Sequence, residues 1–228
     1  MAKIIFYGIK SWEAEYLEGK LSVEAVFHPE LLNKDHLPLE TDAELISVFV
    51  DSAVDQTVLG ALPNLRFIAT RSTGFDHLDL AVCRERGIVI SSVPSYGENT
   101  VAEQAFALIL TLSRKIYQAY DQIREQGNFS FENLQGFDLK GKTIGIVGTG
   151  RIGRHAIKMA TGFDMKILAY DPYPNPELQK QFAFQYAPLD ELLAQSDIVT
   201  LHVPYTPETH HLIDATRLAK MKRGAYLI

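Results

Sequence analysis

The feature that most constrains the fold is the regular alternation of short β-branched runs with helical patterns along the 228-residue chain. Such alternation is typical of parallel sheets covered by helices, because parallel neighbours need a crossover connection. The pattern predicts an α/β protein with two doubly wound parallel sheets, one before residue 95 and one after residue 140. The expected strands are Lys3–Tyr7, Val23–Phe27, Leu45–Val50, Arg66–Thr70, Ile88–Ser91, Thr143–Val147, Lys166–Tyr170, Ile198–His202 and Ala225–Ile228.

A long apolar-periodic stretch, Val101–Gln126, separates the two groups of strands. Thr100 followed by Glu103 reads as a capping box, so one long helix is expected from Val101 onward. We place the domain boundary at its start, giving domains of residues 1–100 and 101–228. Its apolar surface exceeds what one neighbour covers, so it either lies in a core or partly faces a second subunit.

A glycine fingerprint, Gly148-Thr149-Gly150-Arg151-Ile152-Gly153, stands between an expected strand and an expected helix. Gly148 is expected to make the tight turn, Gly150 to let the backbone approach a pyrophosphate, and Gly153 to let helix and strand pack closely. Alone the motif is weak, since glycine turns occur in loops that bind nothing. It predicts a dinucleotide phosphate site at the helix N-terminus.

Asp171 strengthens this interpretation because it ends the next strand, 23 residues beyond Gly148. A carboxylate there accepts hydrogen bonds from ribose hydroxyls and repels a 2′-phosphate. Pro172 and Tyr173 follow, with no arginine to hold that phosphate, so NAD is preferred over NADP. The alternative is that Asp171 only begins an Asp-Pro turn.

Three further segments follow strand ends, where open α/β sheets bind ligands. Val203 and Pro204 are expected to form an apolar wall for the cofactor, with Thr209 after them. The turn Arg71–Asp76 exposes backbone N–H groups that can bind a carboxylate, or is an ordinary glycine turn. Tyr96 either caps a substrate pocket in an expected cleft between the domains or fills the hinge.

Composition excludes several function classes. With 22 Lys+Arg, 28 Asp+Glu and a net charge of −6, nucleic acid is disfavoured as a partner. The longest apolar run, Ala105–Leu110, is too short to span a membrane. The single cysteine, Cys83, allows neither an internal disulfide nor a cysteine zinc cage, and no metal site is expected. Met1 leads straight into a strand pattern without a signal peptide, so a cytoplasmic location is expected.

Taken together, the motifs resemble the D-isomer-specific 2-hydroxyacid dehydrogenase family, most closely its D-lactate dehydrogenase-like branch. The resemblance implies a flavodoxin-like substrate domain and a Rossmann NAD-binding domain. It also implies a homodimer formed through the nucleotide domain and reduction of 2-oxo acids to D-2-hydroxy acids with NADH. The segments that carry it are Arg71–Asp79, Val93–Gln104, Gly136–Gly153, Tyr170–Tyr173 and Leu201–Ile213.

The resemblance implies site roles residue by residue. Thr73 and Gly74 would bind the substrate carboxylate through backbone N–H groups, and Tyr96 would line the substrate pocket. Thr100 would approach the cofactor, with Arg151 and Ile152 on the pyrophosphate. The remaining implied contacts are Asp171 on the adenosine ribose, and Val203, Pro204 and Thr209 along the rest of the cofactor.

The resemblance also implies that the family's catalytic arginine, glutamate and histidine lie beyond Ile228. The chain stops inside an apolar strand pattern, so we expect a fragment with no catalytic residue of its own and no dehydrogenase activity. Of its seven histidines, none is expected to act as the acid. His202 precedes Val203 and Pro204 on a strand, His155 lies on the glycine-loop helix where packing is the commoner role, and His77 starts a helix after the substrate turn. The other four have no carboxylate partner that the sequence identifies: His28, His36, His210 and His211.

Two other functions stay open at this point. One is a non-enzymatic NAD-sensing dimer like the corepressors built on the same fold. The other is a family member acting on glyoxylate or phosphoglycerate, where a phosphorylated substrate is disfavoured because no Lys/Arg cluster follows Arg71. The side chain of the 2-oxo acid is not fixed by the sequence.

Overall fold

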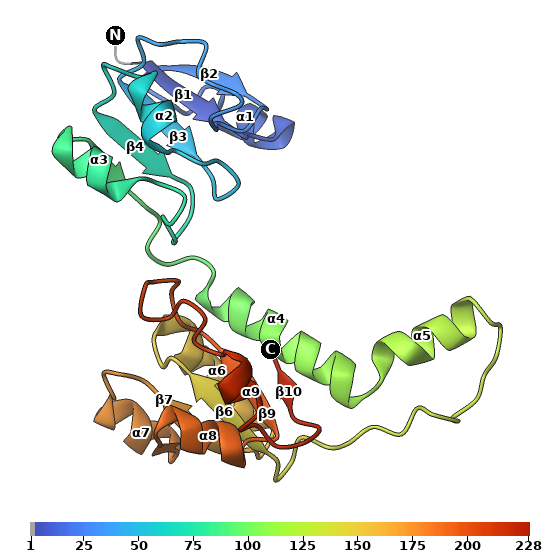
Figure 1. The fold of residues 1–228 in the computed structure, drawn as a ribbon. Coiled ribbons are helices and arrows are strands. Elements are labelled where there is room, and N and C mark those ends of the chain that lie inside the picture. Colours follow the sequence, from blue (N-terminus) through green and yellow to red (C-terminus); the bar gives the residue numbers. More distant parts are fainter. Residues whose placement is uncertain (1–2) are drawn as a thin grey trace. The chain divides into compact units, whose positions relative to one another are not determined.

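The computed structural model describes residues 3–228. The chain divides between Tyr96 and Gly97 into two compact units, and each is described by itself (Figure 1). Each unit is built on one five-stranded sheet in which every pair of neighbouring strands is parallel. The expected α/β class with two doubly wound parallel sheets is therefore confirmed.

The sheet of the first unit has the strand order β2-β1-β3-β4-β5. Its elements are β1 (Lys3–Tyr7), α1 (Ser11–Leu17), β2 (Glu24–His28), β3 (Leu45–Val48), α2 (Gln56–Gly60), β4 (Phe67–Thr70), α3 (Leu80–Glu85) and β5 (Val89–Ser91). Asp55 and Asp79 cap α2 and α3 by accepting backbone N–H bonds, so each helix begins directly after its loop.

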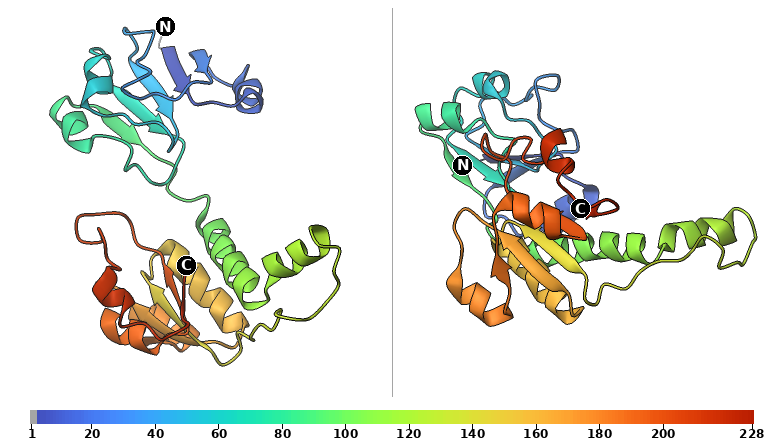
Figure 2. Two further views of the ribbon diagram at one scale, coloured as in Figure 1. Left: turned by 45° about the vertical axis from the view of Figure 1, so that its right-hand side comes forward. Right: turned by 60° about the horizontal axis from the view of Figure 1, so that its bottom comes forward.

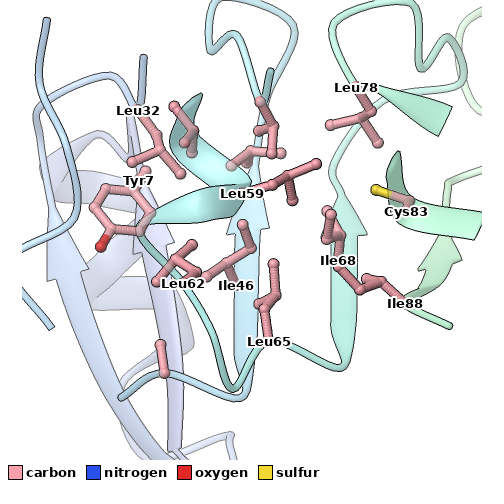
Figure 3. Packing of buried hydrophobic residues seen from close by; sticks show 14 of the residues in the cluster. Tyr7, Leu32, Ile46, Leu59, Leu62, Leu65, Ile68, Leu78, Cys83 and Ile88 are labelled. Carbon is pink, nitrogen blue, oxygen red and sulfur yellow. The ribbon is translucent and has the colours of Figure 1, made fainter. Parts of the chain in front are cut away.

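The core of the first unit lies between its sheet and these helices. Ile46 and Ile68 from adjacent strands are fully buried and in register, and Leu59 of α2 packs against them (Figure 3). Cys83 of α3 belongs to the same cluster and behaves as a small apolar side chain. Burial of these aliphatic groups holds the strand ends that carry the polar residues of the site.

The sheet of the second unit has the order β10-β9-β6-β7-β8. Its elements are α4 (Glu98–Ser113), α5 (Ile116–Arg124), β6 (Thr143–Val147), α6 (Arg151–Gly162), β7 (Lys166–Tyr170), α7 (Pro176–Phe182), β8 (Gln185–Tyr186), α8 (Leu189–Gln195), β9 (Ile198–Leu201), α9 (Ala215–Leu218) and β10 (Tyr226–Leu227). The chain runs outward from β6 to β8 and then crosses back to β9. The strand order therefore reverses beside β6, where open α/β sheets bind their ligands.

Alternate residues of β6 face opposite layers of the second unit. Ile144 and Ile146 join a cluster with α4, α6 and α7, whereas Val147 joins a cluster with α8. Both faces of β6 are thus apolar and covered, which explains the uninterrupted apolar strand in the sequence. The views in Figure 2 show the same layering around this sheet.

The prediction of a single long helix over Val101–Gln126 is wrong. Two helices replace it, and Lys115 between them adopts a left-handed conformation with φ 55°. The carbonyl of Ser113 accepts a hydrogen bond from Phe137 N at 3.0 Å, so a later segment takes the group that a continuing helix would use. The expected capping box is also wrong, because the N-cap is Gly97 and Thr100 lies in the first turn.

All the other expected elements that carry the site are present. Every expected strand exists with bounds within two residues of the prediction, and the sequence missed only the two-residue strand β8 within the described range. No helix among residues 3–228 has both the length and the apolar character needed to cross a membrane.

Candidate active site

The glycine turn after β6 shows three different requirements for glycine. Gly148 has φ +90°, and a Cβ on it would lie 2.5 Å from the carbonyl oxygen of His202. A Cβ on Gly153 would lie only 1.9 Å from the carbonyl oxygen of Gly148. A Cβ on Gly150 would meet no atom within 4 Å. The outer two glycines are therefore needed by the turn and its packing, and the middle one faces open space where a ligand can approach the backbone.

The first turn of α6 adjoins this open space. Its first intrahelical hydrogen bond runs from Arg154 N to Gly150 O, so the preceding amides point out of the helix end. The turn holds no acidic residue, and the helix dipole adds positive potential there. The guanidinium of Arg151 lies 3.6 Å from the Glu98 carboxylate at the start of α4. This arrangement suits a diphosphate group.

Asp171, the expected ribose ligand, follows β7 and is held directly against the glycine turn. Its Oδ2 accepts hydrogen bonds from Thr149 N at 2.7 Å and Thr149 Oγ1 at 2.8 Å, and its Oδ1 accepts one from Tyr173 N at 2.9 Å. A carboxylate accepts about four hydrogen bonds, so one position on Oδ1 stays open. The spacing from Gly148 predicts Asp171, whereas nothing in Gly-Thr-Gly marks Thr149 as its partner.

Val203 brings the end of β9 to the same turn. It is half-buried, packs on the core cluster around Val147, and its Cγ1 lies 3.0 Å from the place a Cβ on Gly148 would take. Pro204 is exposed beside it. Thr209 Oγ1 donates to Pro204 O at 2.5 Å and accepts from Thr206 N at 2.8 Å, so its hydroxyl closes the loop that follows. The ends of β6, β7 and β9 thus meet where the strand order reverses.

No hydrogen bond within residues 3–228 fixes the side chain of Thr100 or Tyr96. Thr100 is exposed in the first turn of α4, and Tyr96, the last residue of the first unit, is 59% exposed. No side-chain hydrogen bond of either residue occurs within residues 3–228. Their expected roles at the cofactor and the substrate stay predictions.

The turn after β4 offers a row of backbone donors. Thr73 and Gly74 are exposed, and the amides of Thr73, Gly74 and Phe75 have no acceptor in the described part of the chain. The turn itself is tied to the segment after β5, because Thr73 Oγ1 donates to Val93 O at 2.8 Å and Val93 N donates to Ser72 O at 3.0 Å. Fixed amides of this kind can bind a carboxylate.

A chain of buried hydroxyl groups supports this turn from below. Ser72 Oγ donates to Gly74 O at 2.6 Å, Thr70 Oγ1 lies 2.5 Å from Ser72 Oγ, and His77 Nε2 lies 3.2 Å from Thr70 Oγ1. Each hydroxyl has one proton, so Thr70 donates to Ser72 and His77 Nε2 donates to Thr70. Burial lowers the pKa of His77 and so favours the neutral ring, although the nearby Asp76 carboxylate acts in the opposite direction. No pattern in the sequence predicts this chain of hydrogen bonds.

Arg71 places a positive charge at the same sheet edge. Its Nη2 donates to Tyr7 O at 3.1 Å and Gly8 O at 3.3 Å, and its Nη1 donates to Ser47 Oγ at 3.2 Å. The side chain thereby links the ends of β1, β3 and β4. Burial lowers the pKa of Arg71, but an arginine remains charged at neutral pH. Its field favours an anion at the turn.

Among the described residues, no histidine beside the glycine turn is paired with a carboxylate that would orient it as a general acid. His202, at the end of β9, lies 3.1 Å from Thr200 Oγ1, and burial lowers its pKa. His28 pairs with the Glu40 carboxylate at 3.0 Å, a partner that the sequence did not identify, but it belongs to β2 in the other unit. Within residues 3–228 no cluster of three or more His, Cys, Asp or Glu residues could hold a metal ion.

The chain is similar to known proteins over nearly its whole length. Residues 106–228 match the family model described as D-isomer specific 2-hydroxyacid dehydrogenase, NAD binding domain. A 2-hydroxyacid dehydrogenase homolog of Haemophilus influenzae is 39% identical over 99% of this chain and 69% of its own length. The D-lactate dehydrogenase of Escherichia coli K12 is 34% identical over 99% of this chain and 70% of its own length.

A solved structure extends the likeness to both units. The D-lactate dehydrogenase from Aquifex aeolicus, complexed with NAD and lactic acid, has a TM-score of 0.89 and 36% identity, covering 98% of this chain and 67% of that chain. The chain thus spans about two thirds of these relatives.

Proposed function

Because the chain belongs to the D-isomer-specific 2-hydroxyacid dehydrogenase family, we propose roles for its residues in the NAD-dependent interconversion of 2-oxo acids and D-2-hydroxy acids. The second unit serves as the NAD-binding domain and the first as the substrate domain, divided near residue 100. NAD, when bound, supplies the hydride carrier. The chain's own residues bind, orient and select the two ligands.

The cofactor site is proposed at the carboxyl ends of β6, β7 and β9. The open face of Gly150 and the start of α6 hold the pyrophosphate, with Arg151 and Ile152 beside it, and Asp171 accepts a ribose hydroxyl through Oδ1. The observation that carries this proposal is the fixed Asp171 carboxylate, which would lie against the 2′-phosphate of NADP. Val203 and Pro204 give an apolar wall, Thr209 secures the loop beyond them, and Thr100 approaches from α4.

The substrate site is proposed at the turn after β4. The amides of Thr73 and Gly74 bind the carboxylate of a small 2-oxo acid, Arg71 supplies a favourable field, and Tyr96 lines the pocket. Pyruvate is the proposed substrate, because the relatives named above include D-lactate dehydrogenases.

A homodimer is proposed through α5 and the segment that follows it. Apolar side chains gather there with large exposed fractions, including Ile123 at 54%, Phe129 at 79% and Phe131 at 82%. Figure 1 shows α5 and its following segment lying to the side of the second unit's sheet, which leaves them uncovered within that unit. An exposed apolar group of this size is typical of a protein interface.

The dimer proposal is tested by Ile123→Glu. This change is expected to reduce the mass measured by light scattering to that of one chain. The control is Ile213→Val, a mild change beside the core cluster that contains Val147, and it should leave the mass unchanged. A mass of one chain for the unaltered protein would refute the proposal.

Residues 1–228 alone are proposed to bind NAD without reducing 2-oxo acids, because their histidines lack a carboxylate partner at the glycine turn. A cytoplasmic location is proposed from the one free cysteine, Cys83, and the cofactor.

The deciding experiment is a calorimetric titration of the chain with NADH and NADPH, followed by titration of the NADH complex with pyruvate and glyoxylate. NADH is expected to bind at least tenfold more tightly than NADPH, and pyruvate to bind without NADH oxidation. Equal affinity for the two cofactors would refute the proposed ribose site, and NADH oxidation would refute the proposed lack of turnover.

A further inference from the structure

Tyr186 links two segments of the cofactor site that the sequence keeps apart. It lies in β8, the edge strand that the sequence did not predict. Its hydroxyl lies 3.0 Å from Thr149 Oγ1 in the glycine turn and accepts a hydrogen bond from Asn175 N, also at 3.0 Å. The ring is half-buried and packs edge-on against Phe184, with centroids 5.0 Å apart. One hydroxyl therefore holds the turn before α6 and the loop before α7 together.

Proton accounting fixes the direction of this link. Thr149 has one hydroxyl proton, and it goes to Asp171 Oδ2. The bond between Thr149 and Tyr186 is then donated by Tyr186, since the threonine oxygen can only accept there. Tyr186 thus donates to Thr149, Thr149 donates to Asp171, and Asn175 N donates to Tyr186. Such bonds strengthen one another because each donor oxygen also accepts.

The two bonds of Tyr186 act on both sides of Asp171. Thr149 stands beside its Oδ2, and Asn175 ends the short loop that begins at Asp171. We propose that Tyr186 is a positioning residue for cofactor selection, holding Asp171 so that the remaining acceptor position on Oδ1 meets the ribose. This inference rests on the proposed contact between Asp171 and the ribose.

Without the tyrosine hydroxyl, Thr149 Oγ1 loses its donor and Asn175 N loses its acceptor. The Asp171 carboxylate then gains freedom to turn, which weakens its bond to a ribose hydroxyl and lets it move away from a 2′-phosphate. Tyr186→Phe should weaken NADH binding about three- to tenfold, with a smaller loss for NADPH. The ring and its contact with Phe184 remain, so the fold should be kept.

The test measures dissociation constants for NADH and NADPH by calorimetry on the whole chain. The variants are Tyr186→Phe, Asp171→Ala and their combination, with Tyr226→Phe as the matched control. Tyr226 lies in β10 at the opposite edge of the same sheet and packs on Phe137. Melting temperatures are recorded beside each titration.

Two results together support the inference. Tyr186→Phe reduces the preference for NADH over NADPH while Tyr226→Phe does not, and Tyr186→Phe has no further effect on that preference in the Asp171→Ala background. A purely structural role would persist in the Asp171→Ala background, and that outcome overturns the inference. An effect of Asp171→Ala without one of Tyr186→Phe overturns the inference alone. Unchanged NADH binding in Asp171→Ala overturns the ribose contact and this inference with it.

A second pair of variants separates the hydroxyl from the side-chain shape. Thr149→Ser keeps a hydroxyl between Tyr186 and Asp171 and should retain most of the NADH preference, whereas Thr149→Val should lose it as Tyr186→Phe does. Equal behaviour of the serine and valine variants overturns the proposed link.

Discussion

Gly153→Ala sets two physical effects against each other in one helix. Alanine in place of glycine inside a helix normally stabilises by about 1 kcal/mol. At this position the new Cβ would lie 1.9 Å from Gly148 O, whereas a relaxed contact needs about 3.5 Å. The start of α6 must therefore move by about 1.5 Å, and this helix carries Ala156 and Ile157, both fully buried. Such overpacking costs about 2 to 4 kcal/mol, so net destabilisation of about 1 to 3 kcal/mol is expected.

Gly162→Ala is the matched control, because Gly162 ends the same helix and a Cβ there meets no atom within 4 Å. It should be neutral or slightly stabilising. Urea unfolding followed by circular dichroism measures both variants. Fluorescence of Trp12, the only tryptophan, reports the first unit and should not change. If Gly153→Ala unfolds at the same urea concentration as the unaltered chain, the close packing of α6 on the glycine turn is refuted.

Three other predictions concern single side chains. Asp171→Ala should lower NADH affinity about ten- to a hundredfold and shift preference toward NADPH, and titration showing unchanged affinity would make Asp171 a turn residue only. Ser72→Ala should weaken pyruvate binding to the NADH complex and cost about 1 to 3 kcal/mol of stability in urea unfolding, and unchanged binding would separate the hydroxyl chain from the substrate turn. Burial raises the pKa of Asp197, but the hydrogen bond from Thr143 N and the ion pair with Lys222 outweigh this effect, so the pKa is lowered on balance. Its stabilisation is therefore present above the ordinary carboxyl pKa and lost as pH falls toward the lowered value, so Asp197→Asn should flatten the acid side of a plot of melting temperature against pH.

The strands were predictable where the sequence itself carries the cause. β1, β6 and β7 have the expected bounds, because each is a short, mostly apolar run and the glycine or Asp-Pro that follows it marks where the buried strand ends. β8 was missed, since two residues, Gln185 and Tyr186, are too few to show a periodicity. The break near Lys115 was missed because its cause, the hydrogen bond from Phe137, comes from a distant segment.

The site divides in the same way. The glycine turn and Asp171 follow a spacing set by one strand, one helix and the next strand, so the sequence could place them side by side. The links from Tyr186 to Thr149 and from His28 to Glu40 depend on side chains brought together by strand order, which no local pattern encodes. The chain from His77 to Gly74 is local, but its direction follows only from counting protons in the folded turn.

Because Ser113 contacts Phe137, residues 114–136 form a closed loop that leaves the second unit and returns to it at the same place. The two ends are fastened twice, by the bond between Ser113 O and Phe137 N and by the Arg114–Asp138 ion pair at 3.0 Å. The approach is so close that a Cβ on Gly136 would lie 2.0 Å from Ser113 O. Replacing this closed loop with a short turn lowers the conformational entropy of the unfolded chain and leaves the path of the remaining backbone unchanged. The segment containing α5 and the residues after it can therefore be deleted as a whole, which gives a nucleotide-binding unit without this exposed apolar surface.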